Sequence, residues 1–167
     1  FEQDFIEAIA TRYSEGGTDR AALDAIYAGT MSGLAKKYPK NNHVITLYAE
    51  SLMDLTPWSY WNEDKSPKVH TVTIVELLER VIEASPDQIG AMHLYIHVME
   101  RFFPEKALAA ADKLGGLVPV AGHLVHMPSH IYLRVGRYAD AILANQMATI
   151  ADEDYISQCN AQGLYPA

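Results

Sequence analysis

The sequence predicts an all-α fold, a right-handed solenoid of about four antiparallel helix pairs. Apolar residues recur at helical spacing through most of the chain, no segment has the pattern of a strand, and the turns between helical segments are short. A chain of 167 residues is long enough for one such domain. We therefore expect residues 1–167 to form a single helical repeat domain.

The first helix is indicated by Phe5, Ile6, Ile9 and Tyr13, which form one apolar stripe, and Thr18 or Asp19 is suited to cap the second. Pro104 is expected at a first helical position, where its missing N–H costs nothing. The eight predicted helices span residues 3–13, 19–38, 43–55, 69–84, 88–102, 104–116, 120–135 and 138–155. Pro128 lacks the N–H that would bond to the carbonyl of Leu124, so we expect a kink or the start of a helix there. A loop of proline, tryptophan and charged residues, 57–68, is inserted between the third and the fourth.

A period of 34 residues runs through the second half of the chain. Tyr138 follows Pro104, Ala141 follows Ala107 and Ala148 follows Leu114 at this interval. Thirty-four residues is the period of the tetratricopeptide repeat, a helix–turn–helix unit. The better-matched repeats are 88–121 and 122–155, and the fold expected is a TPR-like right-handed α-solenoid.

Two segments, HLYIHVMERFFPEKALAAADKL from His93 and GHLVHMPSHIYLRVGRYADA from Gly122, carry a resemblance to known proteins. They resemble a group of bacterial tetratricopeptide-repeat proteins, most of which have no assigned activity. The resemblance implies the fold and says little about function. Members of that group are longer and continue past a pair like Tyr165–Pro166 into a further histidine-bearing helix. We therefore expect the chain to be a fragment of a longer one.

Five of the seven histidines lie between residues 93 and 130, in two neighbouring predicted helices. His93 and His97 are four residues apart and share a face, with Glu100 one turn further on. The other three follow at i, i+3 and i+7 in the next helix, and these are His123, His126 and His130. In a tetratricopeptide solenoid these positions line or flank the concave groove.

Neutral imidazole is a good ligand for Zn, Cu, Fe or Ni, and two histidines at i and i+4 can bind one ion from a single helix. The expected ligands are His93, His97, His126 and His130. His123 and Glu100 are expected to orient a ligand or to act as acid or base. Met127 is a further soft donor, although its position next to His126 points it elsewhere.

Two other interpretations of the histidines stay open. They can form a hydrogen-bond network with Tyr95, Tyr132, Ser129 and Glu100 that spaces the helices, or they can make the groove respond to pH. Four aromatic residues are candidates for contact with a partner or for lining the groove, namely Tyr95, Tyr132, Trp58 and Trp61. Trp58 and Trp61, which lie in the loop, can instead form a flat surface that binds carbohydrate, or they can cover the edge of the core.

Composition excludes several classes of function. The net charge of −8, from 13 basic and 21 acidic residues, argues against nucleic-acid binding and against an anionic membrane surface. No apolar run is long enough to span a membrane. A single cysteine, Cys159, excludes an internal disulfide, and nothing in the sequence indicates a compartment.

The sequence therefore predicts a protein-interaction or assembly module whose histidine-rich groove binds a transition metal. One alternative is a metal-dependent enzyme domain that uses the same histidines, although no nucleophile elbow, phosphate-binding loop or zincin motif is present. Another is a filament subunit. Apolar residues at both ends, such as Ile9 and Ile156, favour association with a protein partner or head-to-tail self-association.

Overall fold

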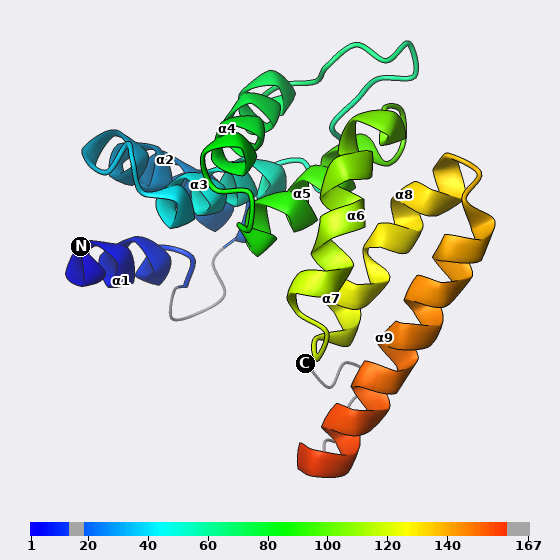
Figure 1. The fold of residues 1–167 in the computed structure, drawn as a ribbon. Coiled ribbons are helices and arrows are strands. Elements are labelled where there is room, and N and C mark those ends of the chain that lie inside the picture. Colours follow the sequence, from blue (N-terminus) through cyan, green and yellow to red (C-terminus); the bar gives the residue numbers. More distant parts are fainter. Residues whose placement is uncertain (14–18, 160–167) are drawn as a thin grey trace. The chain divides into compact units, whose positions relative to one another are not determined.

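The computed structural model describes residues 1–13 and 19–159, which form helices joined by turns and loops, with no strand among them (Figure 1). The prediction of an all-α fold is confirmed. The arrangement of the helices as a TPR-like solenoid stays a prediction. The chain divides into two compact units, residues 1–88 and 89–167. Each unit is described by itself below.

The first unit contains α1 (Glu2–Ala10), α2 (Arg20–Lys37), α3 (Asn42–Asp54) and α4 (Thr71–Ala84). Each helix packs against the next in the chain. Asp19 caps α2, as predicted, by accepting a hydrogen bond from the N–H of Ala21 at 3.1 Å, and Asn41 caps α3 in the same way. Thr18, the alternative cap, lies outside the described residues. The largest fully buried side chains of this unit are Tyr27, Met31, Val44, Ile74, Leu78 and Val81.

The loop of residues 57–68 is held by its own hydrogen bonds. The N–H of Asn62 donates to the carbonyl of Ser66 at 2.9 Å, and the N–H of Lys68 donates to the carbonyl of Tyr60 at 3.0 Å. Tyr60 is buried, while Trp58 is 66% exposed. The loop therefore presents one tryptophan to solvent and anchors itself through a neighbouring tyrosine.

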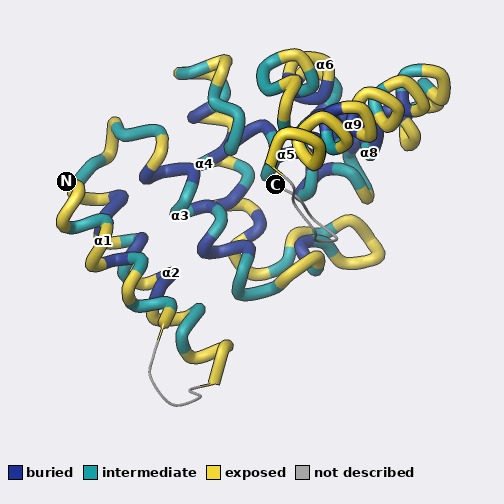
Figure 2. The backbone as a smooth tube through the Cα atoms, turned by 90° about the horizontal axis from the view of Figure 1, so that it is seen from below, coloured by how far each residue is buried: buried dark blue, intermediate teal, exposed yellow. Residues whose placement is uncertain are grey.

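The second unit begins with α5 (Ile89–Met99), a 3₁₀ turn η1 (Pro104–Ala107) and α6 (Leu108–Leu117). It continues with α7 (Gly122–His126), α8 (Pro128–Arg134) and α9 (Tyr138–Cys159). Pro104 occupies the first position of η1, as predicted, and α9 begins 34 residues later. α5 packs against α6 and α8, and α9 packs against α7 and α8. The fully buried side chains of the second unit include Met92, Ile96, Met99, Leu114, Met127 and Ile131. Most of α9 is exposed (Figure 2).

The single helix predicted over residues 120–135 is two helices, which meet at Met127. Proline has no N–H, so Pro128 cannot bond to the carbonyl of Leu124, and it becomes the first residue of α8. On either side of the junction, the N–H of Met127 donates to the carbonyl of His123, and the N–H of His130 donates to the carbonyl of Met127. The break separates the three histidines of this segment between two helices.

Candidate metal centre

α5 carries one half of a histidine cluster in the second unit. His93 and His97 lie one turn apart on this helix, and both side chains are largely buried. Glu100 follows the last residue of α5, and its N–H still donates to the carbonyl of Ile96 at 2.9 Å. This hydrogen bond extends the helical course, so Glu100 stays near the face of His97.

α7 and α8 carry the other half. His123 and His126 belong to α7 and His130 to α8. Because α8 packs against α5, the histidines of the two segments meet. The imidazole rings of His97 and His130, one from each segment, have centroids 5.9 Å apart.

Two imidazoles converge on that of His93. Its Nε2 atom lies 3.1 Å from Nε2 of His97 and 3.1 Å from Nε2 of His123. Each of the three residues offers a ring nitrogen, and all three nitrogens lie within 4.8 Å of one another. We call His93, His97 and His123 the histidine triad.

The remaining two histidines form a pair. Nε2 of His126 lies 3.0 Å from Nε2 of His130, and the ring centroids are 4.8 Å apart. The pair adjoins the triad, since the centroids of the His123 and His126 rings are 6.4 Å apart. We call His126 and His130 the histidine pair.

In each histidine of the pair, the second ring nitrogen, Nδ1, lies next to an oxygen atom that can accept a hydrogen bond. Nδ1 of His130 lies 2.6 Å from Oε2 of Glu100. Nδ1 of His126 lies 2.7 Å from Oδ1 of Asn145, a residue of α9. A further contact to Nδ1 of His126, from Oγ of Ser129, is long at 3.4 Å.

Desolvation favours the neutral form of all three triad imidazoles by lowering their pKa. Desolvation, reinforced by the charge of the neighbouring imidazoles, lowers the pKa of His93 from 6.5 to about 4. The pKa of His97 is also lowered to about 4, mainly by desolvation, and that of His123 is lowered for the same reason. A neutral imidazole retains the lone pair that binds a metal ion.

The carboxyl group of Glu100 is held in its ionised form. Burial alone raises its pKa, but the hydrogen bond from His130 and the electrostatic effect of nearby basic groups outweigh burial, so the pKa lies below its ordinary value. An ionised carboxylate next to a histidine fixes the tautomer and the orientation of the ring.

The triad can hold a metal ion. Two histidine nitrogens bound to one Zn²⁺ at the usual length lie about 2.9 Å apart at a right angle and about 3.3 Å apart at the tetrahedral angle. The 3.1 Å separations around His93 Nε2 fall in this range. His93 is thus spaced as a neighbouring ligand to each of the other two, while the nitrogens of His97 and His123 lie within 4.8 Å of each other.

The structure brings together all six residues that the sequence singled out here, but in a different grouping. His123, expected to support the ligands, lies with His93 and His97 in the triad. His126 and His130, expected to share an ion with those two, form the pair described above. Met127 is fully buried in the core.

The predicted aromatic contacts have other surroundings. Tyr95 and Tyr132 are both buried, and the hydroxyl of Tyr132 donates to Asp112 at 3.0 Å. Trp58 and Trp61 belong to the first unit, whereas the histidine cluster belongs to the second. Their role in binding a partner stays a prediction.

Asn145 is the residue of this site that sequence reasoning missed. It comes 15 residues after His130 on a helix of mixed composition, and no spacing connects it to a histidine. Only the packing of α9 against α7 and α8 brings its amide to His126. A polar side chain in the line of small residues Ala141, Ala144 and Ala148 was the sole available signal.

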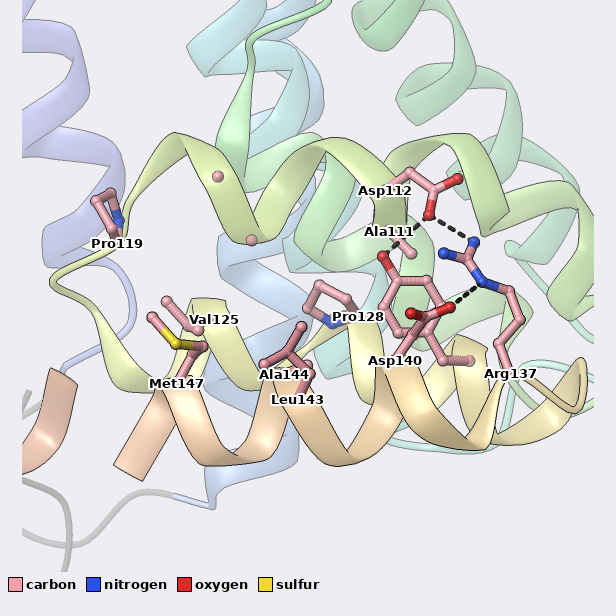
Figure 3. A pocket seen from close by; sticks show the side chains of 13 residues that line it. Ala111, Asp112, Pro119, Val125, Pro128, Arg137, Asp140, Leu143, Ala144 and Met147 are labelled. Atoms are coloured by element: carbon pink, nitrogen blue, oxygen red, sulfur yellow. Dashed lines mark hydrogen bonds and ion pairs between the residues drawn. The ribbon is translucent and has the colours of Figure 1, made fainter. Parts of the chain in front are cut away.

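A separate pocket of about 260 Å³ lies between α6, α7, α8 and α9 (Figure 3). Its polar end is made by the guanidinium group of Arg137, which donates to Asp140 at 2.6 Å and to Asp112 at 2.7 Å. Val125, Leu143 and Met147 line its apolar end. The paired charges fix the start of α9 against α6.

Comparison with known proteins gives no assignment for this arrangement. No family model, no curated protein and no solved structure matches the chain. Among the described residues, every helix is too short or too polar to cross a membrane.

Proposed function

We propose that the second unit is a helical domain that binds a transition-metal ion through His93, His97 and His123. The observation that carries this proposal is the position of His93 Nε2, 3.1 Å from two other Nε2 atoms. An imidazole nitrogen has either one N–H or one lone pair, so hydrogen bonding serves at most one of these contacts well. A metal ion accepts a lone pair from all three nitrogens at once.

The donor set favours particular metals. Three imidazoles suit Zn, Cu, Fe or Ni, whereas Mg²⁺ and Ca²⁺ prefer oxygen donors. Three protein ligands leave at least one coordination position for water, as in catalytic zinc sites. The metal-dependent enzyme predicted as an alternative would use this open position to bind water or substrate. Glu100, which interacts with His97 and His130, would then serve as the acid or base of that site.

The first experiment is to purify the chain without a histidine tag or chelator, to measure bound metals by elemental mass spectrometry, and then to titrate it with Zn²⁺ and Co²⁺. We expect tight binding, with Co²⁺ absorption bands typical of a low coordination number. Replacing both His93 and His97 by alanine should abolish binding at the triad.

The matched control removes two histidines from the first unit, as His43→Ala and His70→Asn. Asparagine is chosen at position 70 because His70 has a φ of 69°, which asparagine tolerates. The control should bind metal as the unchanged protein does. A chain that retains no metal and binds none on titration would contradict the proposal and favour the hydrogen-bond network.

A second function, a TPR-like solenoid module for protein interaction or self-assembly, is favoured by the surface of α9. Leu143, Met147 and Ile150 lie at i, i+4 and i+7 on this helix and are 56%, 47% and 51% exposed. Most of α9 is exposed (Figure 2). The 34-residue interval between the starts of η1 and α9 is that of stacked helix pairs.

Exposed apolar stripes of this kind mark interaction surfaces. We expect sedimentation velocity to show association that grows with concentration, and a Leu143→Ser/Met147→Ser variant to reduce it. Gln146→Ser, at an exposed polar position of the same helix, is the control. A monomer at all concentrations would contradict self-assembly.

A further inference from the structure

We infer that the histidine pair, His126 and His130, holds a second metal ion beside the one proposed at the triad. This inference rests on the proposed function and deepens it, because it makes the site a two-metal centre. It follows from the hydrogen-bond partners of the two rings, which determine where their protons lie.

The tautomer of His130 is fixed by Glu100. A carboxylate can only accept, so at a distance of 2.6 Å from Oε2 the Nδ1 atom of His130 carries the proton and donates it. The Nε2 atom of a neutral His130 then carries a lone pair. That lone pair lies in the ring plane and points toward His126.

The tautomer of His126 is fixed by Asn145, because the orientation of this amide is itself fixed. Nδ2 of Asn145 donates to the carbonyl of Ala141 at 2.8 Å, so Oδ1 is the atom that faces His126. An amide oxygen only accepts, so Nδ1 of His126 donates to it at 2.7 Å. Nε2 of His126 is left with a lone pair as well.

The two lone pairs meet at 3.0 Å, the separation of the two Nε2 atoms. Two neutral imidazoles repel each other in this arrangement, since neither can donate. A positive charge between the nitrogens removes the repulsion, and that charge is either a metal ion or a shared proton.

A metal ion fits the surroundings better than a proton does. A separation of 3.0 Å falls in the range of about 2.9–3.3 Å that two histidine ligands of one ion adopt. Histidines that bind metals almost always donate their other ring N–H to a carboxylate, a carbonyl or water. Glu100 and Asn145 provide two such acceptors, one for each ring.

Ring distances place the two positions side by side. His97 of the triad and His130 of the pair have ring centroids 5.9 Å apart, and His123 and His126 have centroids 6.4 Å apart. The pair supplies two protein ligands, so the second ion keeps several coordination positions for water. Neighbouring ions with exchangeable water are suited to bind an oxygen-donor ligand between them.

The test is the number of ions bound per chain. We expect the unchanged protein to bind two equivalents of Co²⁺, and a His126→Ala/His130→Ala variant to bind one with unchanged affinity at the triad. With two equivalents of Cu²⁺, electron paramagnetic resonance should show coupled ions in the unchanged protein. In the variant, the signal should be that of an isolated ion.

A milder variant keeps both ligands and removes only an acceptor. Asn145→Leu should weaken binding of the second equivalent about 10- to 100-fold and leave the first unchanged. Gln146→Leu, at the adjacent exposed position of α9, should change neither. Far-UV circular dichroism confirms that each variant is folded before it is titrated.

The outcomes separate this inference from the proposed function. A single equivalent that survives His126→Ala/His130→Ala overturns the inference and leaves the triad in place. A single equivalent lost in this variant and in His93→Ala/His97→Ala indicates one ion shared by four histidines, and also overturns it. No binding in any form overturns both, and a proton shared by the pair then explains the 3.0 Å contact.

Discussion

Nδ1 of His130 donates to Oε2 of Glu100 at 2.6 Å, a hydrogen bond that joins α8 to the end of α5. The two residues are 30 positions apart in the sequence. Their contact connects the two helical segments that carry the histidine cluster, and it directs the Nε2 lone pair of His130 toward His126.

Removal of the Glu100 carboxylate should weaken metal binding at the histidine pair. In Glu100→Leu, Nδ1 of His130 loses its acceptor, and the ring is free to rotate or to change tautomer. We expect affinity for the ion held by His130 to fall about 10- to 100-fold by isothermal titration. Glu105→Leu, at an exposed position of η1, is the matched control, and equal losses in the two variants would contradict this role.

The metal-free protein should lose stability as the pH falls from 6.5 toward 4. His93 and His97 have a folded-state pKa of about 4 because burial disfavours their charged form, while the unfolded chain titrates near 6.5. Between these values the unfolded state binds more protons, so the free energy of unfolding decreases as the pH is lowered. Urea denaturation in the presence of a chelator measures this dependence. In His93→Leu/His97→Leu, the free energy of unfolding should depend less on pH in this range. An unchanged dependence would contradict the attribution of the pH effect to these two histidines.

Metal binding should stabilise the second unit against unfolding. A ligand that binds only the native state at 100 times its Kd adds about 2.7 kcal/mol to the free energy of unfolding. We expect thermal unfolding to shift upward with Zn²⁺ and to return on addition of a chelator. The same shift in His93→Ala/His97→Ala/His126→Ala/His130→Ala would show that Zn²⁺ acts elsewhere.

Gly122 allows α7 to approach α9 closely, and alanine at this position should destabilise the protein. A Cβ atom built there lies 1.9 Å from Oδ1 and 2.4 Å from Cγ of Asp152. Asp152 is short, so its side chain must rotate away, and we expect a loss of about 1–2 kcal/mol by chemical denaturation. The loss should disappear in Gly122→Ala/Asp152→Ala. Gly116→Ala, where a Cβ meets no atom within 4 Å, is the control.

Ile131 and Leu133, two residues apart on α8, should respond very differently to truncation. Ile131 is fully buried, whereas Leu133 is 58% exposed. We expect Ile131→Ala to cost about 2–5 kcal/mol because it removes packed methyl groups and leaves a cavity. Leu133→Ala should change stability by about 0.5 kcal/mol or less. Similar losses would mean that the exposed side of α8 is covered in solution.

Helical periodicity was sufficient to predict the all-α class and most of the element boundaries. Asp19 at the start of α2 and Pro104 at the start of η1 lie where the sequence predicts, because capping and proline placement are local properties. For the segment 120–135 the sequence left open a kink or a new helix at Pro128, and in the structure α8 begins there. The missing N–H of Pro128 permits either outcome, and α8 packs against α5, α6 and α9.

The sequence by itself determined that five histidines gather in two neighbouring helical segments. An interval of four residues puts His93 and His97 on one face of α5, which is a matter of helix geometry alone, whereas the break at Met127 divides His123 and His126 from His130. Only the tertiary structure decided how the five rings are grouped. His123 meets His93 across 30 residues of chain, and Asn145 meets His126 across 19, because α8 packs against α5, and α9 packs against α7 and α8. Contacts between helices depend on the angle and the distance at which the helices pack, and neither can be derived from the spacing of residues within one helix.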